Sequence, residues 1–151
     1  MAGTTPPRLP GDRYNTGELR RIGRLTQTWS GWDTRLERTV ILHVLRPELH
    51  SDEQLAHRLA SRLREASRID HPGVARIYDV IGEGVVGVVC EHTDPEDLRR
   101  RVASSGVVSP SLAIDLATRL AVSIDSLHSS GMTHGALTLS SASFTDDDRL
   151  V

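Results

Sequence analysis

A change in hydrophobic spacing constrains the fold of this chain more than any other feature. Residues 39–45 read TVILHVL, a run of β-branched and apolar residues that is typical of a buried strand. The spacing then changes, and residues 52–69 predict an amphipathic helix with Ser51 as its N-cap. Its apolar residues recur at intervals of four, four and three positions: Leu55, Leu59, Leu63 and Ala66.

More strand-like runs flank this pair on both sides. Residues 14–22 and 26–32 precede the buried strand, so three antiparallel strands are expected before the helix. Residues 74–80 and 84–90 follow the helix, and the turn residues Gly82, Glu83 and Gly84 join them. The pattern therefore predicts three strands, one helix and a hairpin.

Helical signals dominate the second half of the chain. The segment DPEDLRRRV, from residue 94, places acids before arginines and predicts a short helix. Its Arg99, Arg100 and Arg101 are more typical of a solvated helix end than of an anion site. Ser109 and Pro110 then begin a long helix that ends at Gly131. Beyond it, strand-like residues near 138–139 and 143–144 could pair.

Composition narrows the class of protein. The 151 residues have 38% hydrophobic content and a net charge of −2, which favours a globular domain and argues against a polyanionic partner. Cys90 is the single cysteine, so an internal disulfide is excluded and a cytoplasmic location is expected. Residues 1–12 contain three prolines and predict a disordered linker or tail. No run is apolar enough to cross a membrane, although the parent protein could be membrane-embedded.

The predicted element order and several ordered segments resemble the protein kinase fold of bacterial Ser/Thr kinases. RYNTGELRRIG resembles the first strand, WDTRLERTVILHVLRPEL the second and third strands, and IDHPGVARIYDV the approach to the fourth. VVCEHTDPEDLRRRV resembles the fifth strand, hinge and next helix. The resemblance implies an α+β fold, with a five-stranded antiparallel small lobe and hinge over 13–93. Residues 94–151 would be the first helices of a truncated large lobe.

This resemblance also implies which small-lobe residues occupy the catalytic positions. Gly23 is the only glycine left at the start of the glycine-rich loop, which looks about two residues short. His43 stands where the phosphate-binding lysine is expected, and an unperturbed imidazole is mostly uncharged at neutral pH. The helix glutamate that should pair with that lysine falls on Arg62, and Glu65 could replace it only after a shift of nearly one turn.

The resemblance likewise implies which residues occupy the hinge and the catalytic loop. Cys90 falls at the gatekeeper position, and Glu91 and His92 follow in the hinge. The stretch MTHGALTLSSA resembles a catalytic loop that has lost its functional side chains. It keeps the histidine, His134. Ala136 stands at the position of the catalytic base, Thr138 at that of the lysine and Ser141 at that of the metal-binding asparagine, so all three functional side chains are missing.

These changes lead to the expectation of a pseudokinase that is not an enzyme. The segments RLREASRIDHPGVARIYDV and SGMTHGALTLSSASF resemble the cytoplasmic pseudokinase domain of actinobacterial MviN/MurJ-type lipid II flippases. This resemblance implies a regulatory scaffold in peptidoglycan precursor export and cell-wall synthesis, within an inner-membrane protein. It further implies phosphorylation by a transmembrane Ser/Thr kinase and recognition by a forkhead-associated (FHA) domain protein.

Two other functions remain open from the residues alone. The chain could be a nucleotide-binding conformational switch without phosphotransfer, or a small-lobe module that forms a homodimer. No cofactor, no metal site and no nucleic-acid partner are expected. The sequence does not indicate which threonine is phosphorylated.

Overall fold

The computed structural model describes residues 5–82, 85–106 and 108–151. The chain divides into two compact units. The first comprises Met1–Arg68 and Ile77–His92, and the second comprises Ile69–Arg76 and Thr93–Val151. The segment 69–76 therefore groups with the second unit, although the sequence places it inside the predicted small lobe.

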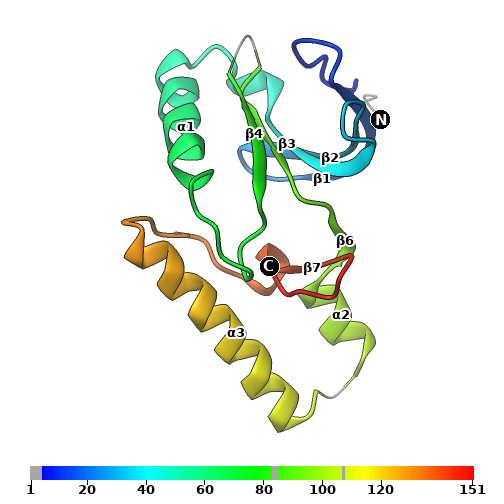
Figure 1. The fold of residues 1–151 in the computed structure, drawn as a ribbon, viewed down its shortest axis with the longest axis vertical. Coiled ribbons are helices and arrows are strands. Elements are labelled where there is room, and N and C mark those ends of the chain that lie inside the picture. The colour runs from blue at the N-terminus through cyan, green and yellow to red at the C-terminus, as the bar shows by residue number, and fades with distance from the viewer. Residues whose placement is uncertain (1–4, 83–84, 107) are drawn as a thin grey trace. The chain divides into compact units, whose positions relative to one another are not determined.

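A five-stranded antiparallel sheet forms the first unit (Figure 1). Its strands lie in the order β1-β2-β3-β5-β4. The bounds are Tyr14–Ile22 for β1, Thr26–Asp33 for β2, Arg38–Leu45 for β3, Ile77–Ile81 for β4 and Gly87–Cys90 for β5. The three strands and the later hairpin are as predicted, while the predicted turn at Glu83 and Gly84 lies outside the described residues.

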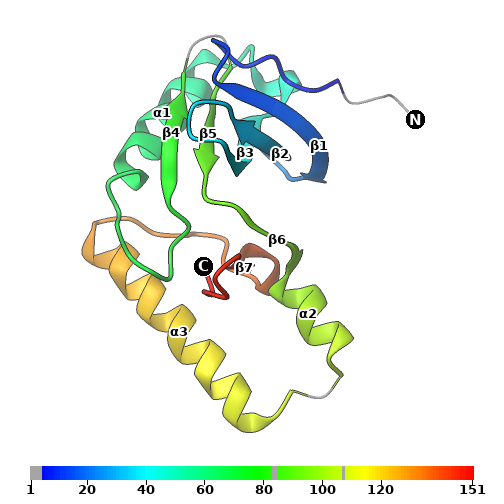
Figure 2. The same ribbon diagram turned by 45° about the vertical axis from the view of Figure 1, so that its right-hand side comes forward.

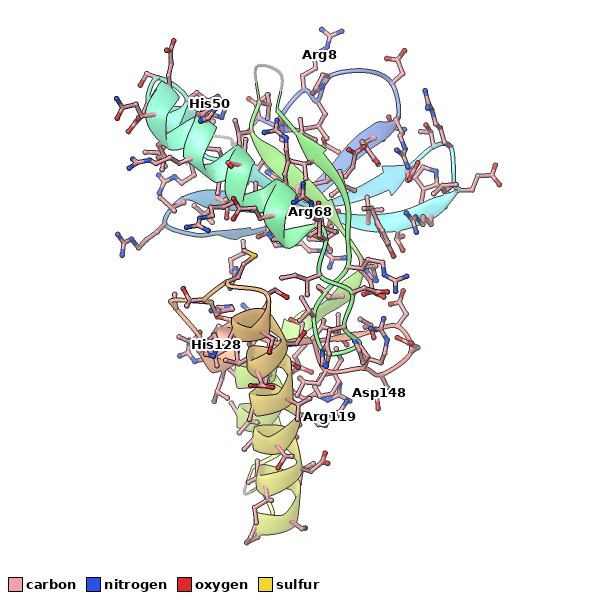
Figure 3. All side chains as sticks on the ribbon, turned by 60° about the vertical axis from the view of Figure 1, so that its left-hand side comes forward. Arg8, His50, Arg68, Arg119, His128 and Asp148 are labelled. Atoms are coloured by element: carbon pink, nitrogen blue, oxygen red, sulfur yellow. The ribbon has the colours of Figure 1, made fainter. Side chains whose placement is uncertain are left out.

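One helix, α1 (Glu53–Ala66), packs against β4 and β5 (Figure 2). Its N-cap is Asp52, whose carboxylate accepts a hydrogen bond from the Leu55 amide; the prediction of Ser51 is wrong by one residue. A 3-10 turn, Pro47–Leu49, links β3 to this helix. His50, labelled near the start of α1 in Figure 3, bonds through Nε2 to the Leu45 carbonyl oxygen at 2.9 Å.

Alternation along β3 divides the apolar side chains between the two faces of the sheet. Val40, Leu42 and Val44 belong to the larger cluster, which contains Trp29 from β2. Leu9 is also buried there, although it lies within the segment that the sequence predicts to be a tail. On the opposite face, Ile41 packs with residues of β4, β5 and α1: Val88, Cys90, Leu63, Ile77 and Val80.

The second unit joins two short strands to two helices. The strand β6 (Thr93–Asp97) pairs with β7 (Ser143–Thr145), and the 3-10 turn Leu139–Ser141 precedes β7. The helices are α2 (Leu98–Ser104) and α3 (Pro110–Ser129). A small hydrophobic core of this unit consists of Leu98, Ala142, Phe144 and Leu150, and apolar side chains of α2 and α3 pack against it.

Two predictions for the second unit require correction, and one is confirmed. Residues 94–96 lie in β6 rather than in the first turn of a helix, because α2 begins only after its N-cap Asp97. Residues 138–139 do not pair with β7, because β6 takes that place. Ser109 does cap α3, accepting a hydrogen bond from the Leu112 amide, and Gly131 follows the helix with a φ of 73°.

Candidate functional site

His43 lies in the middle of β3 and is held by a neighbouring strand. Its Nδ1 is 3.1 Å from Thr28 Oγ1 of β2. Burial, assisted by the positive charge of Arg21, lowers the pKa of His43 to about 4. The imidazole is therefore uncharged at neutral pH, and it can exchange hydrogen bonds but supplies no positive charge.

The turn between β1 and β2 contains Gly23 and is closed by its own backbone. The Gly23 amide donates a hydrogen bond to the Thr26 carbonyl oxygen at 2.8 Å, and the Arg46 amide donates one to the Leu25 carbonyl oxygen at 2.9 Å. Arg46 Nη1 also reaches the Gly23 carbonyl oxygen at 3.5 Å. The Gly23 amide is thus already paired, whereas a phosphate cradle needs backbone amides directed at the ligand.

Arg62 and Glu65 pair with each other on α1. Arg62 Nη1 lies 2.9 Å from Glu65 Oε2, with both side chains exposed on consecutive turns. The helix position expected to hold a glutamate therefore carries a surface ion pair. Such a pair stabilises a helix by about 0.2–0.5 kcal/mol.

Cys90 ends β5, and Glu91 and His92 follow it in the first unit. Burial raises the pKa of the Cys90 thiol to about 12, so the thiol stays protonated and unreactive at neutral pH. His92 Nε2 lies 3.0 Å from Arg20 Nη2, which links this segment to β1. The residue at the predicted gatekeeper position is thus small, buried and packed among apolar side chains.

The loop of the second unit is organised by its hydroxyl groups. Ser141 Oγ donates to the Ala136 carbonyl oxygen at 3.3 Å and lies 3.1 Å from Thr138 Oγ1. Gly135 has a φ of 72°, and His134 is exposed. Ala136, at the position predicted for the catalytic base, has only a methyl group, and the hydroxyl groups of Thr138 and Ser141 form hydrogen bonds within the loop.

The described part of the chain contains no cluster of side chains of the kind that holds a metal ion in proteins. Among those residues, no three His, Cys, Asp or Glu side chains come together in a geometry that could hold one. Mg²⁺ in phosphoryl transfer is ordinarily held by one or two carboxylates together with the nucleotide phosphates, so this finding concerns only sites built from protein side chains alone. Within the same residues, no helix is both long and apolar enough to span a membrane.

The prediction from sequence missed two clusters of polar side chains in the first unit. Thr28 and Arg21 share a row with His43 across three strands, as the cross-strand registers show. Arg13 pairs with the buried Asp33 and with Asp79 on β4. The sequence places Arg21, Thr28 and His43 in three different predicted strands, but which of them face one another depends on strand register.

The chain is similar to known proteins over most of its length. No family model matches the chain. It is 30% identical over 137 residues to serine/threonine-protein kinase PknB of Mycobacterium leprae, a match that covers 87% of this chain and 22% of the relative. It is 28% identical over 138 residues to a probable serine/threonine-protein kinase of Clostridium acetobutylicum, covering 91% of this chain and 21% of the relative. The chain thus spans about a fifth of the length of these curated relatives.

Solved structures establish the fold. The PknI kinase domain of Mycobacterium tuberculosis superposes with a TM-score of 0.78 at 18% identity, covering 99% of this chain and 61% of that domain. The chain therefore has a protein kinase-like fold, in which a five-stranded antiparallel sheet and its helix precede the first helices of the second unit. The predicted fold class is confirmed.

The same comparisons correct the functional expectation. The relatives are named serine/threonine-protein kinases, which contradicts the predictions of a non-enzyme and of a regulatory scaffold for lipid II export. These relatives give no support to a resemblance to MviN/MurJ-type flippases or to the cell-wall role drawn from it. The prediction relied on side chains at a few positions, whereas similarity to the kinases extends over most of the chain.

Proposed function

We propose that this chain is part of an ATP-dependent serine/threonine protein kinase and that its first unit holds the nucleotide. The face of the sheet that carries Ile41 and His43 would receive the nucleotide. Cytoplasmic location is part of this proposal, because ATP is the phosphoryl donor. The observation that carries the proposal is sequence similarity to named kinases over 87% of the chain.

The chemistry proposed is transfer of the γ-phosphoryl group to a Ser or Thr hydroxyl. The bond from the γ-phosphorus to the β,γ-bridging oxygen breaks, a bond to the substrate oxygen forms, and the hydroxyl proton leaves. Positioning and electrostatic stabilisation dominate this reaction, and little covalent chemistry falls to the protein. A sheet that orients the nucleotide can therefore contribute without a charged residue at position 43.

The residue at position 136 sets the expected rate. General-base catalysis contributes about 10²- to 10⁴-fold, and a methyl group supplies none of it. We expect slow transfer by a loop that carries Ala136, with the proton passing to water. Replacing Ala136 with an aspartate should restore an acceptor at this position.

Phosphotransfer to a mixture of Ser- and Thr-containing peptides, measured with γ-labelled ATP, tests the proposal. Slow incorporation is expected for the native chain, with at least about 100-fold more for Ala136→Asp. Ala103→Asp is the matched control, because it adds the same charge at an exposed position of α2. No incorporation by the native chain and none by Ala136→Asp, with no ATP binding by calorimetry, would contradict the proposal.

The partners expected from the sequence stay predictions. They are a transmembrane Ser/Thr kinase that modifies the chain, an FHA-domain reader and a second copy of the chain in a homodimer. Phosphate mapping after incubation with a bacterial Ser/Thr kinase would test the first, and mass in solution at several concentrations would test the last.

A further inference from the structure

One row of residues crosses the sheet from a basic end to an apolar end. Arg21 of β1 is the cross-strand partner of Thr28, and Thr28 is the partner of His43. His43 in turn faces Val88 of β5, which faces Val80 of β4. Directly opposed residues of antiparallel strands point to the same face, so the side chains of this row lie together.

The helix α1 covers only the apolar end of the row. Leu63 of α1 packs into the cluster that contains Val88 and Val80. The helix contacts β4 and β5, and Figure 2 shows it on their side of the sheet. Arg21 is exposed and His43 is half-buried, whereas Thr28 between them is buried, so solvent reaches the polar half of the row at Arg21 and His43.

The polar half offers the groups that bind an anion. Arg21 is always charged and presents several N–H donors. Thr28 Oγ1 and His43 Nδ1 share one hydrogen bond. The pair therefore offers an anion one further donor: the Nε2 hydrogen of His43 if Thr28 donates, or the Thr28 hydroxyl hydrogen if His43 donates. Burial, together with the positive charge of Arg21, disfavours a positive charge on His43. Arg21 is therefore the permanent cation at this point of the sheet.

We propose that Arg21, Thr28 and His43 form an anion site for the polyphosphate of a nucleotide, in which Arg21 of β1 supplies the positive charge. The inference rests on the proposed function, because that function places a nucleotide on this face. It adds that the phosphate-binding cation comes from β1, whereas the residue on β3 contributes only a neutral hydrogen-bonding group.

Calorimetric titration of the 151-residue chain with three probes tests the inference: ATP, adenosine and inorganic tripolyphosphate. Arg21→Gln removes the charge and keeps most of the length, while Arg21→Lys keeps the charge. Arg35→Gln is the matched control, because Arg35 is an exposed arginine in the turn at the opposite end of β2. Thermal unfolding of each variant checks that it is folded.

We expect Arg21→Gln to weaken both tripolyphosphate and ATP about 10- to 100-fold, the effect of one hydrogen bond to a charged group. Adenosine affinity should change less than twofold, Arg21→Lys should bind within about threefold of the native chain, and Arg35→Gln should bind like the native chain. Tripolyphosphate should also shift the NMR resonances of the His43 ring in the native chain, a readout that needs no variant.

Failure of this inference is distinguishable from failure of the proposed function. If the native chain binds ATP and adenosine but Arg21→Gln and Arg35→Gln behave alike, the anion site is wrong and the nucleotide function survives. If Arg21-dependent tripolyphosphate binding occurs without ATP binding, the anion site is correct and the kinase proposal is wrong. Absence of tripolyphosphate binding, or an unmoved His43 resonance, overturns the site.

Discussion

Arg13 holds the carboxylate of Asp33 with two parallel hydrogen bonds. Its Nε donates to Oδ1 at 3.1 Å, and its Nη2 donates to Oδ2 at 2.9 Å. The Asp33 side chain is fully buried at the end of β2, and the amides of Arg35 and Leu36 also donate to Oδ1. The pair thus fixes the start of β1 and the turn between β2 and β3 at one carboxylate.

Replacing Asp33 with asparagine should destabilise the first unit strongly. The change removes the buried carboxylate that Arg13 holds and leaves the guanidinium only Asp79, at 3.4 Å, and breaking a buried pair typically costs about 3–5 kcal/mol. Denaturant unfolding of Asp33→Asn, Arg13→Met and the double variant would measure the coupling. A double variant that loses as much as the sum of the two single variants would show that the residues do not act as a pair.

Acid should weaken the same pair. Hydrogen bonding to Arg13 lowers the pKa of Asp33 below its usual value. The unfolded carboxyl therefore binds its proton at a higher pH than the folded one, so the stabilisation is full above about pH 4. It is lost as pH falls through the lower folded pKa. Unfolding free energies between pH 5 and pH 2 should fall more steeply for the native chain than for Asp33→Asn.

His43 should produce a second pH dependence in a higher range. Its pKa of about 4 lies below the unfolded value of about 6.5, so the unfolded chain binds the extra proton between these values. Stability is complete above pH 6.5 and declines as pH falls toward 4, by up to about 3 kcal/mol. His43→Gln should remove this slope between pH 7 and pH 4.5; an unchanged slope would assign it to other groups.

Much of the first unit could be predicted, because local spacing encodes it. The β1 bounds agree with prediction at both ends, and β2 and β3 differ by one residue each, since alternation and β-branched residues mark buried strands. Ser109 and Gly131 likewise mark the ends of α3 through cap chemistry. These signals depend only on neighbours in the chain.

The strand β6 could not be predicted, because its partner is distant. Residues 94–97 contain three acids, which is typical of the first turn of a helix. Pairing with Ser143–Thr145 overrides that preference and leaves only Asp97 as the cap of α2.

In the candidate site, the i,i+3 pair of Arg62 and Glu65 follows from local spacing. The row of Arg21, Thr28 and His43 requires the register of three strands.

The two tryptophans should differ sharply in their contribution to stability. Trp29 is 2% exposed within the larger core cluster, and its indole donates to Gln27 Oε1 at 3.3 Å. Trp32, three residues later, points to the other face and is 42% exposed. Trp29→Ala should cost about 3–5 kcal/mol by denaturant unfolding. Trp32→Ala should cost less than about 1 kcal/mol, and similar losses for both would contradict the assigned burial.

Gly87 should tolerate no side chain, because β5 approaches β3 closely at this point. A Cβ at residue 87 would lie 2.5 Å from the His43 carbonyl oxygen and 3.1 Å from Val44 Cα, both main-chain atoms of a paired strand. Relief would require the strands to separate, so Gly87→Ala should destabilise the chain by about 1–3 kcal/mol.

Gly82→Ala provides the matched control for this close approach. Among the described residues, its Cβ would meet only Arg64 Nη2, at 3.2 Å, the end of a flexible side chain that can move away. Thermal unfolding should therefore show a clear loss for Gly87→Ala and a small change for Gly82→Ala. Because the Gly87 contact is with His43 itself, Gly87→Ala should also shift the NMR resonances of the His43 ring. A stable Gly87→Ala variant with an unmoved His43 ring would show that β3 and β5 are further apart than described.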